Sequence, residues 1–308
     1  MTQTVDPADE MHSDPPAFST DTPLEARHHH EPVSQRAEHP VAIDVRGVTK
    51  VFETSEQQKT VALQDVSFQI RVGEFVSLIG PSGCGKSTLL RLVSGLVECS
   101  GGDIKVKDLP PREARRQRLF GIVFQSPVLF DWRTVENNVA LPLQIMGEDG
   151  TKIRTRVEEL LDLVGLSEFK KHYPWQLSGG MQQRVAISRA LTFAPPFLLM
   201  DEPFGALDMI TRDRMAQELL RIWSNAPGTT VMFITHSIPE AVLLSDRVVV
   251  MTARPGKILK TVDIELARPR DEKVRESSDF YKYENELRRL LQLEHAESPE
   301  DAMEALAG

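Results

Sequence analysis

Gly80-Pro81-Ser82-Gly83-Cys84-Gly85-Lys86-Ser87-Thr88 is the stretch that decides the fold, because its spacing is the G-x-x-x-x-G-K-[ST] of a phosphate-binding loop. An apolar strand over residues 74–80 leads into it. A helix follows, marked by apolar residues at i, i+3, i+4 and i+7: Leu89, Leu92, Val93 and Leu96. Such a unit turns backbone N–H groups and the positive end of a helix toward phosphate. We therefore predict that residues 80–88 bind the phosphates of a nucleotide.

Three side chains of this loop carry specific predictions. Lys86 supplies a compact cation for the β- and γ-phosphates, and the hydroxyl of Ser87 can bind Mg²⁺. Cys84 is small enough for the loop, and we assign it no redox role. The alternative is a glycine turn with an incidental lysine. It does not explain why a strand and an amphipathic helix flank the loop at the required places.

A second acidic site follows another apolar strand, in Phe197-Leu198-Leu199-Met200-Asp201-Glu202. Consecutive side chains of a strand point to opposite sides. We therefore expect Asp201 to bind the hydration shell of Mg²⁺, and Glu202 to face the water that attacks the phosphate. An Asp-Glu pair alone is common in proteins, so this prediction depends on the phosphate-binding loop.

Apolar strands and amphipathic helices alternate along the chain. Strands are expected at 197–200, 231–235 and 248–251, and helices over 153–164 and 187–194. This alternation predicts an α/β fold with a mostly parallel sheet. The strand-like runs 42–45 and 61–70 indicate an antiparallel start, and a helical insertion is expected over about residues 126–190.

The chain of 308 residues has a formal net charge of −9, which is spread unevenly. Residues 1–40 hold eight acids against two bases and residues 268–308 eleven against seven, so the middle is near +1. Proteins that bind nucleic acid usually present a basic surface, which this charge balance does not predict, so we expect no nucleic-acid partner. Two cysteines, the lack of any apolar run of about 18 residues and the lack of a secretory signal predict a cytoplasmic protein without a membrane span.

The two ends of the chain differ from its middle in composition. Residues 1–40 are rich in Pro, Ser, Thr, Asp and Glu, which predicts a disordered acidic tail. It contains His28, His29 and His30. Metal binding there is conceivable, but a solvated run is the more usual role. Residues 268–308 are expected to form an extension with a short amphipathic helix near 283–291 and an acidic tail.

The stretch Leu177-Ser178-Gly179-Gly180-Met181-Gln182-Gln183-Arg184 resembles the LSGGQ signature of ABC ATPases, with Met181 in place of the usual glutamine. Ser178 and the two glycines can begin a helix whose free N–H groups face an anion. The resemblance implies that this anion is the γ-phosphate of ATP held by another subunit. Ser178, Gly179, Gly180 and Gln182 are therefore expected to bind nucleotide. A plain serine N-cap is the alternative.

Other residues resemble family elements in the family's order. Gln125 resembles the Q-loop glutamine, which senses Mg²⁺ and the attacking water. Asp208, in Ala206-Leu207-Asp208, resembles the D-loop, which crosses the dimer interface. His236 resembles the switch histidine that contacts the γ-phosphate, and Phe52 stands where an aromatic stacks on adenine. The resemblance covers about residues 41–267, which we expect to form the ATPase domain.

The resemblance implies a fold and a mechanism. The fold is a P-loop ATPase with a RecA-like parallel-sheet core, an antiparallel β subdomain and an α-helical subdomain. Two copies would enclose two ATP molecules, with Mg²⁺. Glu202 would activate the water, while Lys86 and His236 would stabilise charge on the transferred phosphoryl group.

Leu129-Phe130-Asp131-Trp132-Arg133-Thr134-Val135 resembles the L-x-P-W-R-T-V segment of importers for nitrate, sulfonates, taurine and related solutes, with Asp131 in place of proline. The resemblance implies an importer subunit at the cytoplasmic face of the membrane, peripheral to a transmembrane permease that a solute-binding protein supplies. We expect Trp132 to contact the permease. A surface aromatic in a local cluster is the alternative.

Two other functions are considered. An exporter or lipoprotein-release ATPase would use the same catalytic residues, but the Trp132-Arg133-Thr134 segment disfavours it. A non-transport ABC ATPase acting on DNA or ribosomes would need a long coiled-coil insertion or a second core, and the sequence shows neither. The solute stays open among nitrate, a sulfonate, taurine and a pyrimidine precursor.

Overall fold

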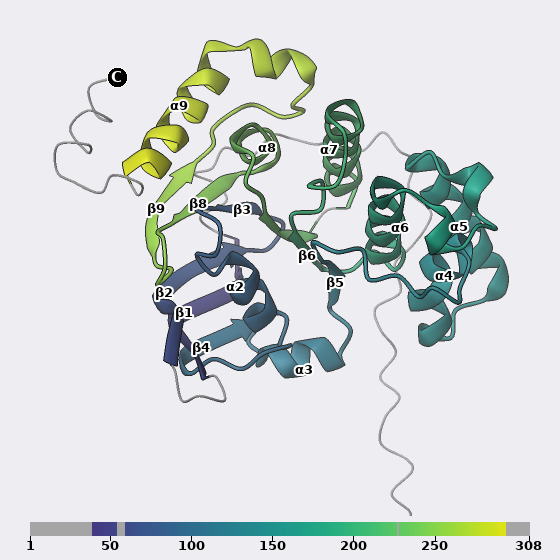
Figure 1. Ribbon diagram of the computed structural model, residues 1–308, viewed down its shortest axis with the longest axis horizontal. Coiled ribbons are helices and arrows are strands. Elements are labelled where there is room, and N and C mark those ends of the chain that lie inside the picture. The colour runs from purple at the N-terminus through teal and green to yellow at the C-terminus, as the bar shows by residue number, and fades with distance from the viewer. Residues whose placement is uncertain (1–38, 54–58, 227, 294–308) are drawn as a thin grey trace, which may run out of the picture. The chain divides into compact units, whose positions relative to one another are not determined.

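The computed structural model describes residues 39–53, 59–226 and 228–293 (Figure 1). Almost all of the predicted N-terminal tail lies outside these ranges, as do His28, His29, His30 and the predicted acidic end after 293. Within the described ranges, no helix combines the length and apolar character that a membrane span requires.

A six-stranded sheet in the order β5-β6-β7-β3-β8-β9 carries the core. Its first five strands are parallel and β9 runs antiparallel to β8. The strands are β3 (Phe75–Ile79), β5 (Phe120–Val123), β6 (Phe197–Asp201), β7 (Thr230–Ile234), β8 (Arg247–Met251) and β9 (Ile258–Asp263). Every residue of β3, β6 and β7 is buried, as expected for a parallel sheet covered on both faces. The predicted α/β class is confirmed, and the carboxyl ends of β6, β7 and β3 lie side by side.

A second, antiparallel sheet has the order β2-β1-β4. It consists of β1 (Val41–Glu53), β2 (Lys59–Arg71) and β4 (Gly101–Val106), and the short helix α3 (Pro111–Arg116) follows β4. The predicted run 61–70 lies within β2, but the prediction of a strand limited to 42–45 was wrong. β1 continues through shifts of register with β2, and Gly47 takes a φ of +57° there. Such bulges interrupt the two-residue alternation on which the prediction relied.

Helices cover the parallel sheet and extend from one edge of it (Figure 1). They are α2 (Lys86–Val93), α4 (Val135–Met146), α5 (Gly150–Leu163), α6 (Gly179–Leu191), α7 (Met209–Ser224), α8 (Ile238–Leu244) and α9 (Ser278–Leu293), with 3₁₀ turns η1 (Ser167–Phe169), η2 (Pro174–Gln176) and η3 (Glu272–Glu276). The helical insertion expected over about 126–190 contains α4, α5 and α6, which pack together. Leu96 was wrongly placed on the helix after the loop. α2 ends at Val93, Gly95 takes a φ of +66°, and Leu96 is exposed.

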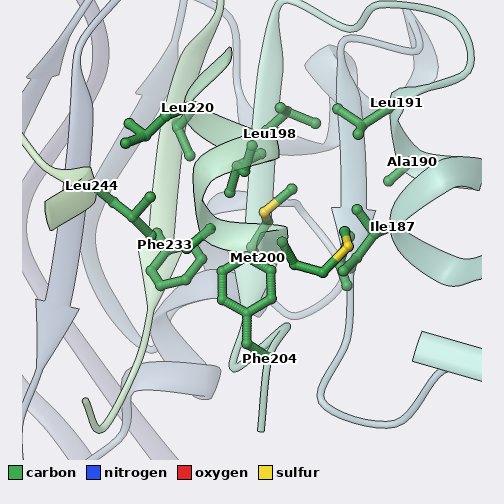
Figure 2. Close-up of a cluster of buried hydrophobic side chains, with 14 of the residues drawn as sticks. Ile187, Ala190, Leu191, Leu198, Met200, Phe204, Leu220, Phe233 and Leu244 are labelled. Atoms are coloured by element: carbon green, nitrogen blue, oxygen red, sulfur yellow. The ribbon is translucent and has the colours of Figure 1, made fainter. Parts of the chain in front are cut away.

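Two apolar cores lie on opposite faces of the parallel sheet, because alternate residues of each strand point to opposite sides. One face packs Leu198 and Met200 of β6 and Phe233 of β7 against α6, α7 and α8, as Figure 2 shows. The other face carries Leu199 and Met232, which join the core that contains the apolar residues of α2 and β1. The sheet therefore holds α6, α7 and α8 on one face, and α2 and the antiparallel sheet on the other.

The C-terminal extension packs on the domain. α9 is longer than predicted, and it buries Phe280 and Leu287 beside α8. Arg270, only 3% exposed, lies before η3 in the same extension. Its guanidinium donates to the carbonyl oxygens of Val242, Leu243 and Ser245, at the end of α8, and to those of Ile264 and Leu266.

Candidate active site

The loop from β3 to α2 has the backbone shape that its glycines predict. Gly85 takes a φ of +102°, and a Cβ there would lie 2.6 Å from Leu63 Cδ2 and 3.0 Å from the Ala62 oxygen. Only glycine meets both demands without strain. α2 begins at the next residue, so its unpaired N–H groups open at the loop.

Lys86 is buried beneath this loop, at 7% exposure. Its Nζ donates to the oxygens of Gly80 at 2.7 Å and Pro81 at 2.9 Å, and lies 3.8 Å from the Cys84 Sγ. The ammonium is therefore held on the main chain of the loop whose phosphate-binding role was predicted. Cys84 is 1% exposed and fills the space under the loop, in line with the structural role expected of it.

Ser87 and Asp201 meet across the end of the sheet. The Ser87 hydroxyl donates to Asp201 Oδ1 at 2.9 Å, and Asp201 is 4% exposed. Burial raises the pKa of Asp201, while the bond from Ser87 opposes this rise. A hydroxyl and a carboxylate are hard oxygen donors that suit Mg²⁺, so the pair fits the predicted metal site.

Glu202 stands just beyond β6 with a φ of +46°, a conformation that is uncommon for a residue other than glycine. Its N–H donates to the Ile234 oxygen at 2.9 Å, which fixes this turn to β7. Strand alternation was therefore the wrong reason for expecting Asp201 and Glu202 to diverge. The left-handed turn after the strand separates them.

Gln125, Glu202 and His236 converge on one oxygen atom. Gln125 Nε2 donates to Glu202 Oε2 at 3.3 Å, and His236 Nδ1 lies 3.3 Å from the same oxygen. Three of the four predicted catalytic side chains thus come together from the ends of three neighbouring strands, β5, β6 and β7. Gln125 was also expected to bind metal, but in the structure its amide contacts Glu202 and makes no hydrogen bond to Ser87 or Asp201.

Lys86, Ser87, Gln125 and Glu202 share one pocket of about 330 Å³, while Asp201 and His236 are not among its lining residues. It is lined by Phe52, Thr60, Ala62, Ser82, Gly83, Gly85, Lys86, Ser87, Thr88, Gln125, Glu202 and Arg254. Phe52 is 42% exposed, and the Lys50 Nζ lies over its ring, 5.0 Å from the centroid. No role was predicted for Arg254, whose guanidinium donates to the Gly83 oxygen at 3.3 Å.

The signature residues lie outside this pocket. Ser178 is the N-cap of α6, and its hydroxyl accepts from the Met181 N–H at 3.3 Å. Among the described residues, and apart from its chain neighbours and the backbone of α6, no atom lies within 4 Å of the position that a Cβ on Gly179 would occupy. Gln182 differs from prediction, because its amide donates to the oxygens of Pro174 and Leu177, at 3.0 and 3.3 Å. That side chain therefore positions the signature loop.

Asp208 is likewise outside the pocket. It is the N-cap of α7, where it accepts from the Thr211 N–H at 3.0 Å. That bond lowers the pKa of Asp208. The two residues before Asp208 lie close to the signature. A Cβ on Gly180 would lie 3.2 Å from Leu207 Cδ2 and 3.3 Å from the Ala206 oxygen. The residues expected to face another subunit thus share one region of the chain.

Comparison with known proteins agrees with this geometry. A family model described as ABC transporter matches residues 63–205. The aliphatic sulfonates import ATP-binding protein SsuB of Bacillus cereus is 44% identical over 231 residues, 75% of this chain and 89% of that protein. The nitrate import ATP-binding protein NrtC of Synechococcus elongatus is 44% identical over 256 residues, 82% of this chain but only 38% of that longer protein.

A solved structure shares the fold: the dimeric structure of a post-hydrolysis state of an ATP-binding cassette bound to ADP and Pi. It matches with a TM-score of 0.66 and 35% identity, over 72% of this chain and 98% of that one. The predicted P-loop fold, with its parallel core, antiparallel sheet and helical subdomain, is confirmed. The chain therefore belongs to the ABC transporter family, as an ATP-binding and ATP-hydrolysing subunit whose cofactors are ATP and Mg²⁺.

Proposed function

We propose that two copies of this chain power the import of a small solute through a separate transmembrane permease. The observation that carries the proposal is the segment 129–135, whose aromatic side chains Phe130 and Trp132 are exposed and which begins four residues after Gln125 of the active site. Relatives named for the import of nitrate and of aliphatic sulfonates support it.

The site supports hydrolysis by positioning and charge stabilisation. Glu202 would accept a proton from the attacking water, while Gln125 and His236 hold its carboxylate in place. His236 and Lys86 would then stabilise charge that develops on the transferred phosphoryl group. Ser87 and Asp201 would hold Mg²⁺, which neutralises phosphate charge when bound.

A second copy would complete the nucleotide site. Ser178, Gly179 and Gly180 form the N-terminus of α6 and do not line the pocket of their own chain. Those free N–H groups favour an anion, and the γ-phosphate held by another copy is the ligand we propose. The dimeric cassette among the similar structures supports this assembly.

The permease would dock at the aromatic segment. Trp132 is 75% exposed and its ring lies 5.0 Å from that of Phe130, so the two form a raised apolar surface. Asn138 of α4, which is fully buried, holds the segment through hydrogen bonds to Phe130, Arg133 and Thr134. A firmly held aromatic surface next to a catalytic loop can link partner movement to hydrolysis.

We further propose that the subunit works peripherally at the cytoplasmic face of the membrane, and that a solute-binding protein delivers the solute. The test is to express the chain with the permease and binding protein of its neighbouring genes. ATPase activity in membranes is then measured with nitrate, taurine, an alkanesulfonate and a pyrimidine precursor in turn.

One solute should stimulate the activity, and Glu202→Gln should abolish that stimulation. Trp132→Ala should keep the ATPase activity of the purified chain but lose the stimulation. If no solute changes the activity and the chain does not join the permease, the importer function is wrong, while ATP hydrolysis by the chain stands.

A further inference from the structure

Glu240 is a buried carboxylate that the hydrolysis chemistry does not use. It lies on α8 and is 6% exposed. Thr235 Oγ1 donates to Glu240 Oε2 at 2.6 Å, and the same hydroxyl accepts from the Ser237 N–H at 3.0 Å. Thr235 and Ser237 flank His236. The Thr235 hydroxyl, held by Glu240, therefore fixes the main chain on both sides of the imidazole.

Arg212 of α7 connects this cluster to the loop 206–208. Its Nη2 donates to the Leu207 oxygen at 3.3 Å. Its Nε lies 3.6 Å from Glu240 Oε1, an ion pair without a hydrogen bond, and the two side chains are 29% and 8% exposed. One guanidinium thus touches both the main chain before Asp208 and the carboxylate that holds Thr235.

A second arginine reaches the same place from the C-terminal extension. Arg275 of η3 pairs with Asp213 of α7 at 2.8 Å, and its charge, like that of Arg212, acts to lower the pKa of Glu240. Burial nevertheless raises the pKa of Glu240, so the fold pays to keep a carboxylate there. A buried ion pair often adds little to the free energy of unfolding. The pair of Arg212 and Glu240 is therefore better explained by the groups that it holds in place.

We propose that Glu240 and Arg212 are positioning residues, which tie the loop 206–208 to His236 so that the place of the loop sets the distance from the imidazole to Glu202. The inference rests on the proposed roles of His236 and of a second copy facing that loop. Contact with the second copy would then be transmitted along Leu207, Arg212, Glu240 and Thr235 to the catalytic oxygen.

The test compares substitutions that keep or remove single contacts in the full-length chain. Thr235→Val removes the hydroxyl and Thr235→Ser keeps it. Arg212→Gln removes the charge on α7, and Arg221→Gln is its control, because Arg221 lies on the same helix in an exposed pair with Glu218. The measurements are kcat, KM for ATP, nucleotide affinity and Tm.

We expect Thr235→Val and Arg212→Gln each to lower kcat about tenfold, the size of one lost buried hydrogen bond or ion pair, with KM and affinity within about twofold. Thr235→Ser and Arg221→Gln should match the parent chain. In a His236→Ala background, Thr235→Val should cause no further loss of the residual turnover, because its effect passes through the imidazole.

Other results overturn the inference. If Thr235→Ser and Thr235→Val behave alike, or if Thr235→Val lowers Tm and raises KM together with the loss of kcat, the hydroxyl only stabilises the fold. An equal effect of Arg221→Gln would show a general response of α7. If Arg212→Gln does not fold, the two Thr235 variants decide alone. Full turnover in His236→Ala would instead contradict the proposed active site.

Discussion

Asn138 holds the aromatic segment with an unusual number of bonds for one side chain. Its Oδ1 accepts from the Phe130 N–H at 2.9 Å, and its Nδ2 lies within 3.1 Å of the oxygens of Phe130, Arg133 and Thr134. Asn138→Ala removes all four contacts from a site that is fully buried. We expect a loss of stability and a loss of permease coupling.

The size of the expected loss of stability depends on which backbone groups keep a hydrogen-bond partner in Asn138→Ala. The Thr134 oxygen still accepts from the Asn138 N–H and the Phe130 oxygen from the Arg133 N–H, so both remain paired. The Phe130 N–H and the Arg133 oxygen lose the partner that Asn138 supplies. A buried polar group left unpaired costs about 1–3 kcal/mol, and both residues are partly exposed, so water can replace some of the loss. We expect the free energy of unfolding to fall by about 2–4 kcal/mol.

Urea unfolding followed by circular dichroism measures this change, with Asn137→Ala as the matched control. The side chain of Asn137 makes no hydrogen bond within the described part of the chain, so its removal should change the free energy by less than about 0.5 kcal/mol. The ATPase activity of the purified Asn138→Ala protein should persist where it remains folded, while stimulation through the permease is lost. If the free energy of unfolding falls by less than about 1 kcal/mol, the Phe130 N–H and the Arg133 oxygen are not left unpaired as we expect.

Three further predictions concern the nucleotide site and its surroundings. Glu202→Gln should bind ATP within about twofold of the parent affinity but hydrolyse it about 10²–10⁴-fold more slowly, and near-normal single-turnover hydrolysis would contradict the assigned base. Gly85→Ala should weaken ATP binding at least about tenfold in a fluorescent-nucleotide titration, because its Cβ would meet Leu63 Cδ2 at 2.6 Å on a backbone with a φ of +102°. Burial raises the pKa of Glu240 above its ordinary value of 4.5, so the folded state binds this proton more tightly and loses stability as the pH rises through the folded pKa. Glu240→Gln lacks that loss, so urea unfolding should show the parent chain losing stability relative to the variant from pH 4.5 toward neutrality, and a constant difference would show that Glu240 does not titrate there.

The parts of the site that the sequence predicted lie at the ends of buried parallel strands. Residues that follow such strands gather at one edge of the sheet whatever the order of the strands. Ser87, Asp201, Glu202 and His236 could therefore be assigned to one site before their distances were known. A local pattern was enough, because the topology of the sheet brings the strand ends together.

The features that were missed depend on contacts distant in sequence. Arg254 reaches Gly83 from 171 residues away, and no spacing rule connects them. Gln182 turns to the carbonyl oxygens of the loop before it, although its place in the signature suggested a ligand contact. Asp201 and Glu202 have different partners because the chain makes a left-handed turn at Glu202, which strand periodicity does not reveal.

The hydrogen bonds of Arg270 limit how far the chain can be shortened from its C-terminal end. Sequence similarity to the family was expected to end near residue 267, which suggests a natural place to shorten the chain. Ending the chain there would remove Arg270, whose guanidinium donates to the carbonyl oxygens of Val242, Leu243 and Ser245 at the end of α8. α8 begins directly after His236 and Ser237. We therefore expect the loss of hydrogen bonds at the C-terminal end of this short helix to change the position of the His236 imidazole. We therefore expect a shortened chain to keep its ATPase activity only if it retains Arg270.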